Sequence, residues 1–131
     1  MTTDDWSDVT LGDFVILQRG FDLPTTKRRP GNVPILGSFG VTGHHDTAII
    51  QGPGVTVGRS GASIGVATYS PVDFWPLNTT LFVKDFCGND ERFAYYFLRS
   101  IDFRRFNSGS AQPSLNRNFV HPIPIRIPKV T

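Results

Sequence analysis

The stretch GPGVTVGRSGASIGVATY, residues 52–69, can be interpreted as a phosphate-binding loop or as two strands. Its first half has the glycines, the basic residue and the hydroxyl of such a loop. In a P-loop four residues separate the glycines and Lys-Ser/Thr follows, whereas five residues separate Gly52 from Gly58 here and the next residue is Arg59. A P-loop also opens onto a helix whose N–H groups complete the anion site. Residues 61–69 alternate as a strand does, so the stretch predicts two strands folded over a turn.

The flanking sequence holds further strand signals, bounded by glycine and proline. Apolar and β-branched residues predict strands at residues 34–37, 48–51 and 78–84. A last apolar segment, residues 123–127, is interrupted by prolines, which lack the N–H that a central strand must donate, so we expect an edge strand there. Residues 38–47 are polar and rich in glycine, and they predict a loop.

The N-terminal part of the chain predicts one short helix. An apolar group follows Asp13 and ends at a glycine, so we expect a helix over residues 13–20 with Asp13 as its cap. Phe14 and Leu17 would form its buried face. Trp6 is expected to anchor the N-terminal segment on the core, the commonest role of an isolated tryptophan.

A second, longer helix is predicted to begin after Asn89, which can cap it, and to run to about Phe106. Phe93, Phe97 and Ile101 follow one another at four-residue spacing, which places them on one face of a helix. We expect this aromatic stripe to be part of the core and not a ligand site.

Length and composition indicate one domain. A chain of 131 residues can bury one substantial core, and its 13 glycines, 10 prolines and 11 phenylalanines favour a turn-rich fold with aromatic packing. The single cysteine excludes an internal disulfide, and the sequence has neither a membrane-spanning apolar run nor a signal peptide. We therefore expect a cytoplasmic protein.

Charge is distributed unevenly along the chain, although the net charge is only +2. Residues 1–26 hold five Asp and one Arg, whereas residues 92–131 hold seven Lys or Arg and one Asp. The basic C-terminal part suggests a polyanionic partner, with a solvated basic helix face as the alternative.

Residues that could support catalysis are sparse. Ser60 misses the Gly-x-Ser-x-Gly pattern by one position. Cys87 and His121 could form a catalytic pair, but one Cys and one His in a chain of this length are usually unrelated. His44 and His45 are adjacent and lack the spacing of metal ligands. No adenine methyltransferase motif or dinucleotide fingerprint occurs, so we expect a binding protein that is not an enzyme and needs no cofactor or metal.

The order of several short motifs is more specific than any one of them. Together they resemble the target recognition domain of type I restriction-modification specificity subunits, over about residues 6–128. The segments that carry the resemblance are Trp6 with Leu11-Gly12-Asp13 and Gly20, GPGVTVGRSGASIGVATY, FWPLNTTLFV, the YYFL helix, SGSAQPSLN and HPIPIRIP.

This resemblance implies an α/β (α+β) domain with a twisted, partly barrel-like mixed sheet that reads one half of a split double-stranded DNA target. It also implies that methyl transfer and cleavage belong to partner methylation (M) and restriction (R) subunits. In the family a long spacer helix and a second recognition domain follow, whereas this sequence stops at Thr131. We expect residues 1–131 to be a single recognition domain, as a cut-out domain, a half subunit that could pair with another, or a free-standing relative.

Three loops and one turn are predicted to contact DNA. Affinity comes from Lys and Arg on phosphates, and sequence reading from Arg on guanine and Asn or Gln on adenine. For Gln112 and Asn116 a role in tying their loop to the core remains the alternative. A protein-interaction module that has lost DNA reading, and a small-ligand or enzymatic domain, remain alternatives for the whole chain. The predicted DNA-binding residues are Lys27, Arg28 and Arg29 in residues 25–32, His44 and His45 in residues 38–47, Arg59 at the turn, and Gln112, Asn116, Arg117 and Asn118 in residues 108–118.

Overall fold

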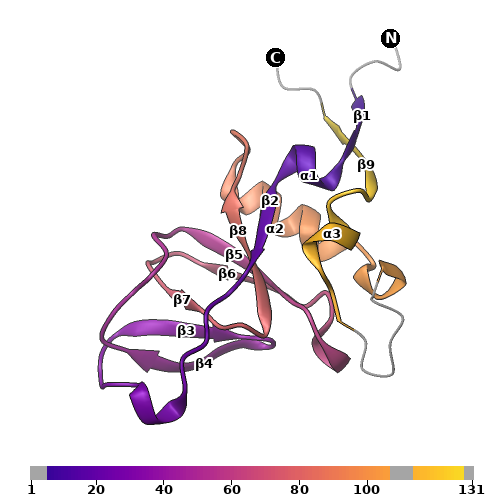
Figure 1. The fold of residues 1–131 in the computed structure, drawn as a ribbon. Helices are drawn as coiled ribbons and strands as arrows, with labels where there is room; N and C mark the ends of the chain where they lie inside the picture. Colours follow the sequence, from indigo (N-terminus) through magenta and orange to yellow (C-terminus); the bar gives the residue numbers. More distant parts are fainter. Residues whose placement is uncertain (1–5, 107–113, 129–131) are drawn as a thin grey trace.

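A four-stranded antiparallel sheet forms around the two strands predicted from residues 52–69 (Figure 1). The computed structural model describes residues 6–106 and 114–128. The sheet has the order β2-β8-β5-β6, with Val55 of β5 opposite Tyr69 of β6. Its strands are β2 (Ile16–Arg19), β8 (Thr80–Asp85), β5 (Gly54–Gly58) and β6 (Ala67–Ser70).

The connection between β5 and β6 is longer than the predicted turn. It contains a 3₁₀ turn, η3 (Gly61–Ser63), and the chain becomes extended again only at β6. Gly61 and Gly65 have φ values of +57° and +85°, a left-handed conformation that interrupts a strand and that glycine adopts readily. The paired strands are therefore confirmed, but the alternating pattern of residues 61–69 overstated the length of the second one.

Two smaller sheets complete the strands. β3 (Val33–Gly37) pairs with β4 (Gly40–His45) antiparallel and with β7 (Trp75–Pro76) in parallel. The second sheet joins β1 (Trp6–Thr10) to β9 (Pro124–Pro128).

Three of the predicted strands are confirmed by β3, β8 and β9, and β9 pairs only with β1 among the described residues, as expected of an edge strand. The loop predicted over residues 38–47 is wrong for most of its length, because β4 pairs with β3. The strand predicted at residues 48–51 is reduced to an isolated bridge between Ile50 and Phe74.

The helix predicted over residues 13–20 is also wrong. The chain instead passes from β1 through the short helix α1 (Leu11–Phe14) into β2. Thr10 is the N-cap, and Asp13 accepts hydrogen bonds from the backbone N–H and the hydroxyl of Thr10, at 3.0 and 2.9 Å. These bonds hold the pKa of Asp13 below its usual value. Trp6 is 49% exposed, so it does not anchor the N-terminal segment by burial.

Gly20 has a packing role in place of the predicted helix stop. A Cβ atom at this position would lie 2.1 Å from the carbonyl oxygen of Leu77 and 2.6 Å from that of Pro76. The end of β2 can therefore approach the segment between β7 and β8 only because residue 20 has no side chain.

Helix α2 (Glu91–Ser100) covers one side of the four-stranded sheet, where it packs on β5 and β6. Asp90, not Asn89, is its cap, and its buried residues are Ala94 and Leu98. The predicted aromatic face is therefore displaced by one residue: Phe93 is 40% exposed. The helix ends earlier than expected, and residues 103–106 form the separate 3₁₀ turn η4 (Phe103–Phe106).

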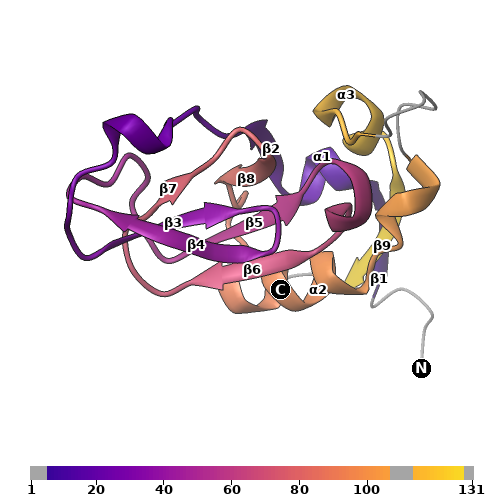
Figure 2. The same cartoon turned by 90° about the horizontal axis from the view of Figure 1, so that it is seen from below.

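The core lies between the sheet and its helices. Figure 2 shows α2 and α3 (Arg117–Val120) on different sides of the domain. Leu17, Val57 and Leu98 are buried in one cluster, and Phe14 packs against Phe97 with ring centroids 4.9 Å apart. The side of the domain that carries α3 and β2 is thus separated from the side that carries α2.

Candidate nucleic-acid interface

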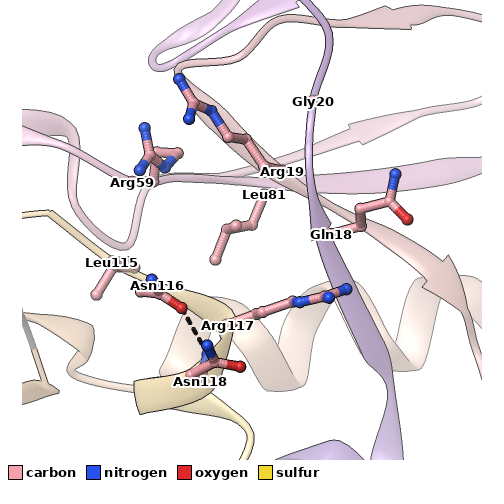
Figure 3. A pocket seen from close by; sticks show the side chains of 9 residues that line it. All are labelled: Gln18, Arg19, Gly20, Arg59, Leu81, Leu115, Asn116, Arg117 and Asn118. Carbon is pink, nitrogen blue, oxygen red and sulfur yellow. Dashed lines mark hydrogen bonds between the residues drawn. The ribbon is translucent and has the colours of Figure 1, made fainter.

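A concave surface of about 540 Å³ lies between β2, the end of β5 and α3 (Figure 3). Its walls come from segments that are far apart in the sequence, and most of its side chains are polar or basic. The lining residues are Gln18, Arg19, Gly20, Arg59, Leu81, Leu115, Asn116, Arg117 and Asn118.

Arg59 stands at the base of this surface because its backbone is bonded on both sides. Its N–H donates to the carbonyl oxygen of Thr79 at 3.1 Å, and its carbonyl accepts from the N–H of Leu115 at 2.5 Å. The next residue, Ser60, forms an isolated bridge with Ser114. These backbone hydrogen bonds, which join the end of β5 to the residues just before α3, therefore fix the position of the Arg59 backbone.

The opposite wall is held by two side-chain hydrogen bonds. The Asn116 side-chain oxygen accepts from the N–H of Asn118 at 2.8 Å and caps α3. At the other end of α3, His121 Nε2 accepts from the N–H of Leu17 at 3.0 Å. This bond joins α3 to β2, so that Arg117 and Asn118 lie across the concave surface from Gln18 and Arg19, and Arg117 extends toward β2 in Figure 3.

The environment of His121 favours its neutral form. Burial lowers the pKa of His121, and the nearby positive charge of Arg117 lowers it further. A neutral Nε2 is required for this atom to accept the Leu17 hydrogen bond. The junction between β2 and α3 is therefore stable at neutral pH.

The arginines of the concave surface are not neutralised. Arg59 donates from Nη1 to the carbonyl oxygen of Asn78 at 3.3 Å, whereas its Nε is buried and has no partner among the described residues. Burial lowers the pKa of Arg59, and the charge of Arg19 adds to this. None of the described lining residues is Asp or Glu. The described lining of this surface therefore carries positive charge and no negative side chain.

The predicted basic loop has a different environment. Lys27 ends the 3₁₀ turn η2 (Thr25–Lys27), and its exposed side chain makes no hydrogen bond or ion pair to the described residues. Arg28 donates from Nε to the carbonyl oxygen of Leu23 at 3.2 Å. Arg29 makes two hydrogen bonds to the carboxylate of Asp46, at 2.6 and 3.1 Å.

The contact between Arg29 and Asp46 changes the pKa of both groups. The hydrogen bonds to Asp46 raise the pKa of Arg29, and the hydrogen bond from Arg29 lowers the pKa of Asp46. Each group thus favours the charged state of the other, and the charge of Arg29 is compensated within the domain.

The two predicted histidines separate. His44 is exposed on β4, whereas only 3% of His45 is exposed. His45 Nδ1 accepts from the N–H of Arg29 at 3.0 Å, and its ring packs edge-on against Trp75. Strand alternation turns neighbouring side chains to opposite faces, so His45 lies in the interior while His44 is open to solvent.

The structure thus divides the predicted DNA-binding residues. Arg59, Asn116, Arg117 and Asn118 share the concave surface, while residues 27–29 and His44 lie near the sheet of β3 and β4. Gln112 lies outside the described residues. The tying role considered for Asn116 is present as its cap of α3, although its side chain is also exposed.

Sequence reasoning missed two residues of this surface, Gln18 and Arg19. They follow the apolar residues 14–17, which were assigned to a helix, and that assignment placed them near a helix end. Had residues 16–19 been predicted as a strand, Gln18 and Arg19 at its end would have been candidates for this surface. A run of four apolar residues, however, does not distinguish a strand from a helix.

Other kinds of site find little support in the described part of the chain. Residues 6–106 and 114–128 contain no group of three or more side chains suited to holding a metal ion. None of the helices in these ranges has the length and apolar character that a membrane span requires.

Comparisons with known proteins identify the fold. The family model described as "Type I restriction modification DNA specificity domain" matches residues 3–131. The S subunit of a type I restriction-modification system from M. genitalium superimposes with a TM-score of 0.77 at 18% identity, over 98% of this chain and 36% of that chain.

A second solved structure has a similar fold. It is described as "Structural basis underlying complex assembly and conformational transition of the type I R-M system", and it matches with a TM-score of 0.72 at 12% identity, over 98% of this chain and 35% of its own. At such identities the likeness concerns the fold, and it confirms the predicted mixed α+β class. No match was found among curated proteins.

Proposed function

Because this chain belongs to the family of type I restriction-modification DNA specificity domains, we propose that it binds double-stranded DNA and reads one half of a bipartite target. The family is a non-catalytic part of these systems, as the sequence predicts. The single observation that supports DNA binding most is the concave surface between β2, β5 and α3, where the described lining holds Arg19, Arg59 and Arg117 and no carboxylate. Duplex DNA carries a dense line of phosphates that such a surface attracts.

Affinity and sequence reading are assigned to different parts of this surface. Arg59 is fixed by its backbone and partly buried, which suits a contact to the DNA backbone. Arg117 and Asn118 are exposed at the rim, and their side chains match the edges of guanine and adenine in the major groove. Lys27 and His44 would add contacts to phosphates outside the concave surface.

The partners of the domain belong to the same proposal. The chain spans 36% and 35% of the two solved structures that it matches. We assign methyl transfer to an M subunit and cleavage to an R subunit, and reading of the other half of the target to a second recognition domain. The complex would act in the cytoplasm, the compartment that the sequence favours.

A second candidate, a protein-interaction module without DNA reading, is favoured by one observation. The side of the domain that carries α2 exposes large apolar side chains, with Tyr96 at 58% and Phe39 at 73%. Both line a second hollow, of about 410 Å³, with Tyr95 and Arg92. Exposed aromatic residues of this kind are enriched in protein interfaces. This hollow is lined by other residues than the concave surface, so the two surfaces can be tested separately.

The experiment that tests the proposed function is duplex binding measured by fluorescence anisotropy over a range of salt concentrations. We expect the logarithm of the association constant to fall linearly with the logarithm of the salt concentration, by about 0.9 per phosphate contacted. Selection from a random duplex pool at low salt, with and without M subunit, should then enrich one half-site. Absence of duplex binding at low salt in both conditions would favour the protein-interaction module.

A further inference from the structure

The pair formed by Arg19 and Arg59 is unusual because both groups are cations and one is partly buried. Arg19 lies close enough to lower the pKa of Arg59 by its charge, and the described residues around them include no acid. A buried guanidinium is normally paired, because leaving a charged group without a partner away from water is costly. An external anion would supply the missing counter-charge.

The hydrogen bonds of Arg59 point to the same kind of ligand. Of its described side-chain bonds, Nη1 reaches the carbonyl oxygen of Asn78, while Nε is covered and unpaired. A carbonyl oxygen satisfies a donor but does not cancel the charge. A phosphate accepts hydrogen bonds from guanidinium N–H groups and also supplies the negative charge that a carbonyl oxygen lacks.

A base edge would not do the same. Guanine offers two acceptors to an arginine but has no net charge. It could accept hydrogen bonds from Arg59, yet it would leave the repulsion between Arg19 and Arg59 in place. Arg117, in contrast, is exposed, extends from α3 toward the opposite wall, and makes no described side-chain bond that fixes it (Figure 3).

We propose that Arg19 and Arg59 jointly bind one backbone phosphate of the duplex, an inference that rests on the proposed function. This phosphate contact is independent of base sequence. It fixes the position of the DNA over the concave surface, so that Arg117 and Asn118 meet base edges at a set distance. The two arginines come from β2 and from the end of β5, so the site depends on the packing between these strands.

The salt dependence of duplex binding tests whether the phosphate is shared. Arg19→Ala, Arg59→Ala and the double variant are compared on a random duplex. Arg99→Ala is the control, since Arg99 is exposed and belongs to α2, which lies on a different side of the domain from α3. A shared phosphate predicts that each single change flattens the salt slope by up to about 0.9 and that the double change reaches about 0.9 in total. A double change that flattens the slope by about twice that amount, or variants that match Arg99→Ala, would overturn the proposal.

A second measurement separates this proposal from the proposed function and from misfolding. Inorganic phosphate is titrated into the wild-type protein at constant ionic strength, and the Nε–H signals of the arginines are followed by NMR. We expect the signals of Arg19 and Arg59 to shift with phosphate and not with chloride. If the two arginine signals shift while no duplex binds, the phosphate site is supported and the proposed DNA reading is wrong. If duplex binds while the signals do not shift, the phosphate site is wrong and the proposed DNA binding is supported.

The Arg19→Ala variant protects the test against a folding defect, because the Arg19 side chain is exposed and makes no hydrogen bond to the described residues. Its circular dichroism spectrum and melting temperature should match those of the wild type. A loss of affinity for a selected target without a loss for random duplex would assign Arg19 or Arg59 to base reading and would contradict the proposal.

Discussion

The arginines at positions 28 and 29 and those at positions 19 and 59 carry the same charge in different surroundings. Arg29 faces the carboxylate of Asp46 at 2.6 Å, and Arg28 is bonded to the carbonyl oxygen of Leu23. Arg19 and Arg59 line one concave surface, and no acid is among the described residues that line it.

This difference shows that a basic side chain offers its charge to an external anion only where that charge is not already paired within the protein. The three consecutive basic residues 27–29 are the strongest local charge signal in the sequence, yet part of their charge is compensated within the domain. Arg19 and Arg59 are isolated in the sequence, and only the fold brings them together. The second pair therefore has more to gain from binding an anion.

The largest expected effect comes from a substitution at Gly20, which follows Arg19 at the end of β2. In Gly20→Ala the new Cβ would meet the carbonyl oxygens of Leu77 and Pro76, whereas in Gly43→Ala the nearest atoms would be the ends of the Arg28 and Ile35 side chains, at 3.5 and 3.7 Å. We expect Gly20→Ala to lower the free energy of unfolding by about 3 kcal/mol, and Gly43→Ala to change it by less than about 1 kcal/mol. Urea denaturation measures both. Equal effects would show that the end of β2 is not tightly packed.

The next effect compares the two groups of arginines directly. We expect Arg59→Ala to weaken binding to every duplex by about tenfold at moderate salt, since it removes a charged hydrogen bond to phosphate. Arg29→Ala should weaken binding by less than about threefold, because the charge it removes is already paired. Anisotropy titrations with one random and one selected duplex check this. A larger loss for Arg29→Ala would reverse the ranking of the two regions.

A smaller effect is expected from releasing the paired charge. Asp46→Asn removes the carboxylate that holds Arg29 while keeping a side chain of similar shape. Affinity for random duplex should rise by about threefold, and the salt slope should steepen by up to about 0.9. Asp85→Asn serves as the matched control, because its carboxylate bonds the N–H of Cys87 and makes no described ion pair. Unchanged binding by Asp46→Asn would mean that Arg29 does not lie near DNA.

The smallest effect concerns the hydrogen bond from Leu17 to His121, which joins the two walls of the concave surface. The folded state lowers the pKa of His121 from its ordinary 6.5, so the folded protein binds the proton less readily than the unfolded chain. The stability that the neutral imidazole contributes is therefore complete above pH 6.5 and is lost as the pH falls through the lower folded pKa.

Thermal unfolding of the wild type and of His121→Asn between pH 7.5 and 5 measures this contribution. The wild type should lose more of its melting temperature than the variant over this interval, and His44→Asn, which changes an exposed histidine, should behave like the wild type. Parallel curves for wild type and His121→Asn would show that the junction does not depend on this imidazole.

Local patterns predicted the parts of the fold that depend on neighbouring residues. The strands around Val55 and Tyr69, the presence of a helix after residues 88–91 and an edge strand near residues 123–127 all follow from such patterns. The ends of the elements and the buried face of α2 were predicted less accurately. The helix buries Ala94 and Leu98 because the sheet that it covers determines which face turns inward. The four apolar residues before Gln18 suit a helix or a strand equally.

The candidate site could be predicted only in part, because its decisive contacts are between distant residues. Arg59, Arg117 and Asn118 were expected from their residue types and positions in turns. The proximity of Arg19 to Arg59, the pairing of Arg29 with Asp46 and the burial of His45 depend on strand packing that no single sequence segment encodes.

The most direct test of the account is a chemical-shift map of the domain with a half-site duplex by solution NMR. The account predicts that the backbone signals of Gln18, Arg19, Arg59, Arg117 and Asn118 shift on binding, while those of α2 stay in place. Shifts concentrated on α2 or around residues 27–29, with the concave surface unaffected, would contradict it.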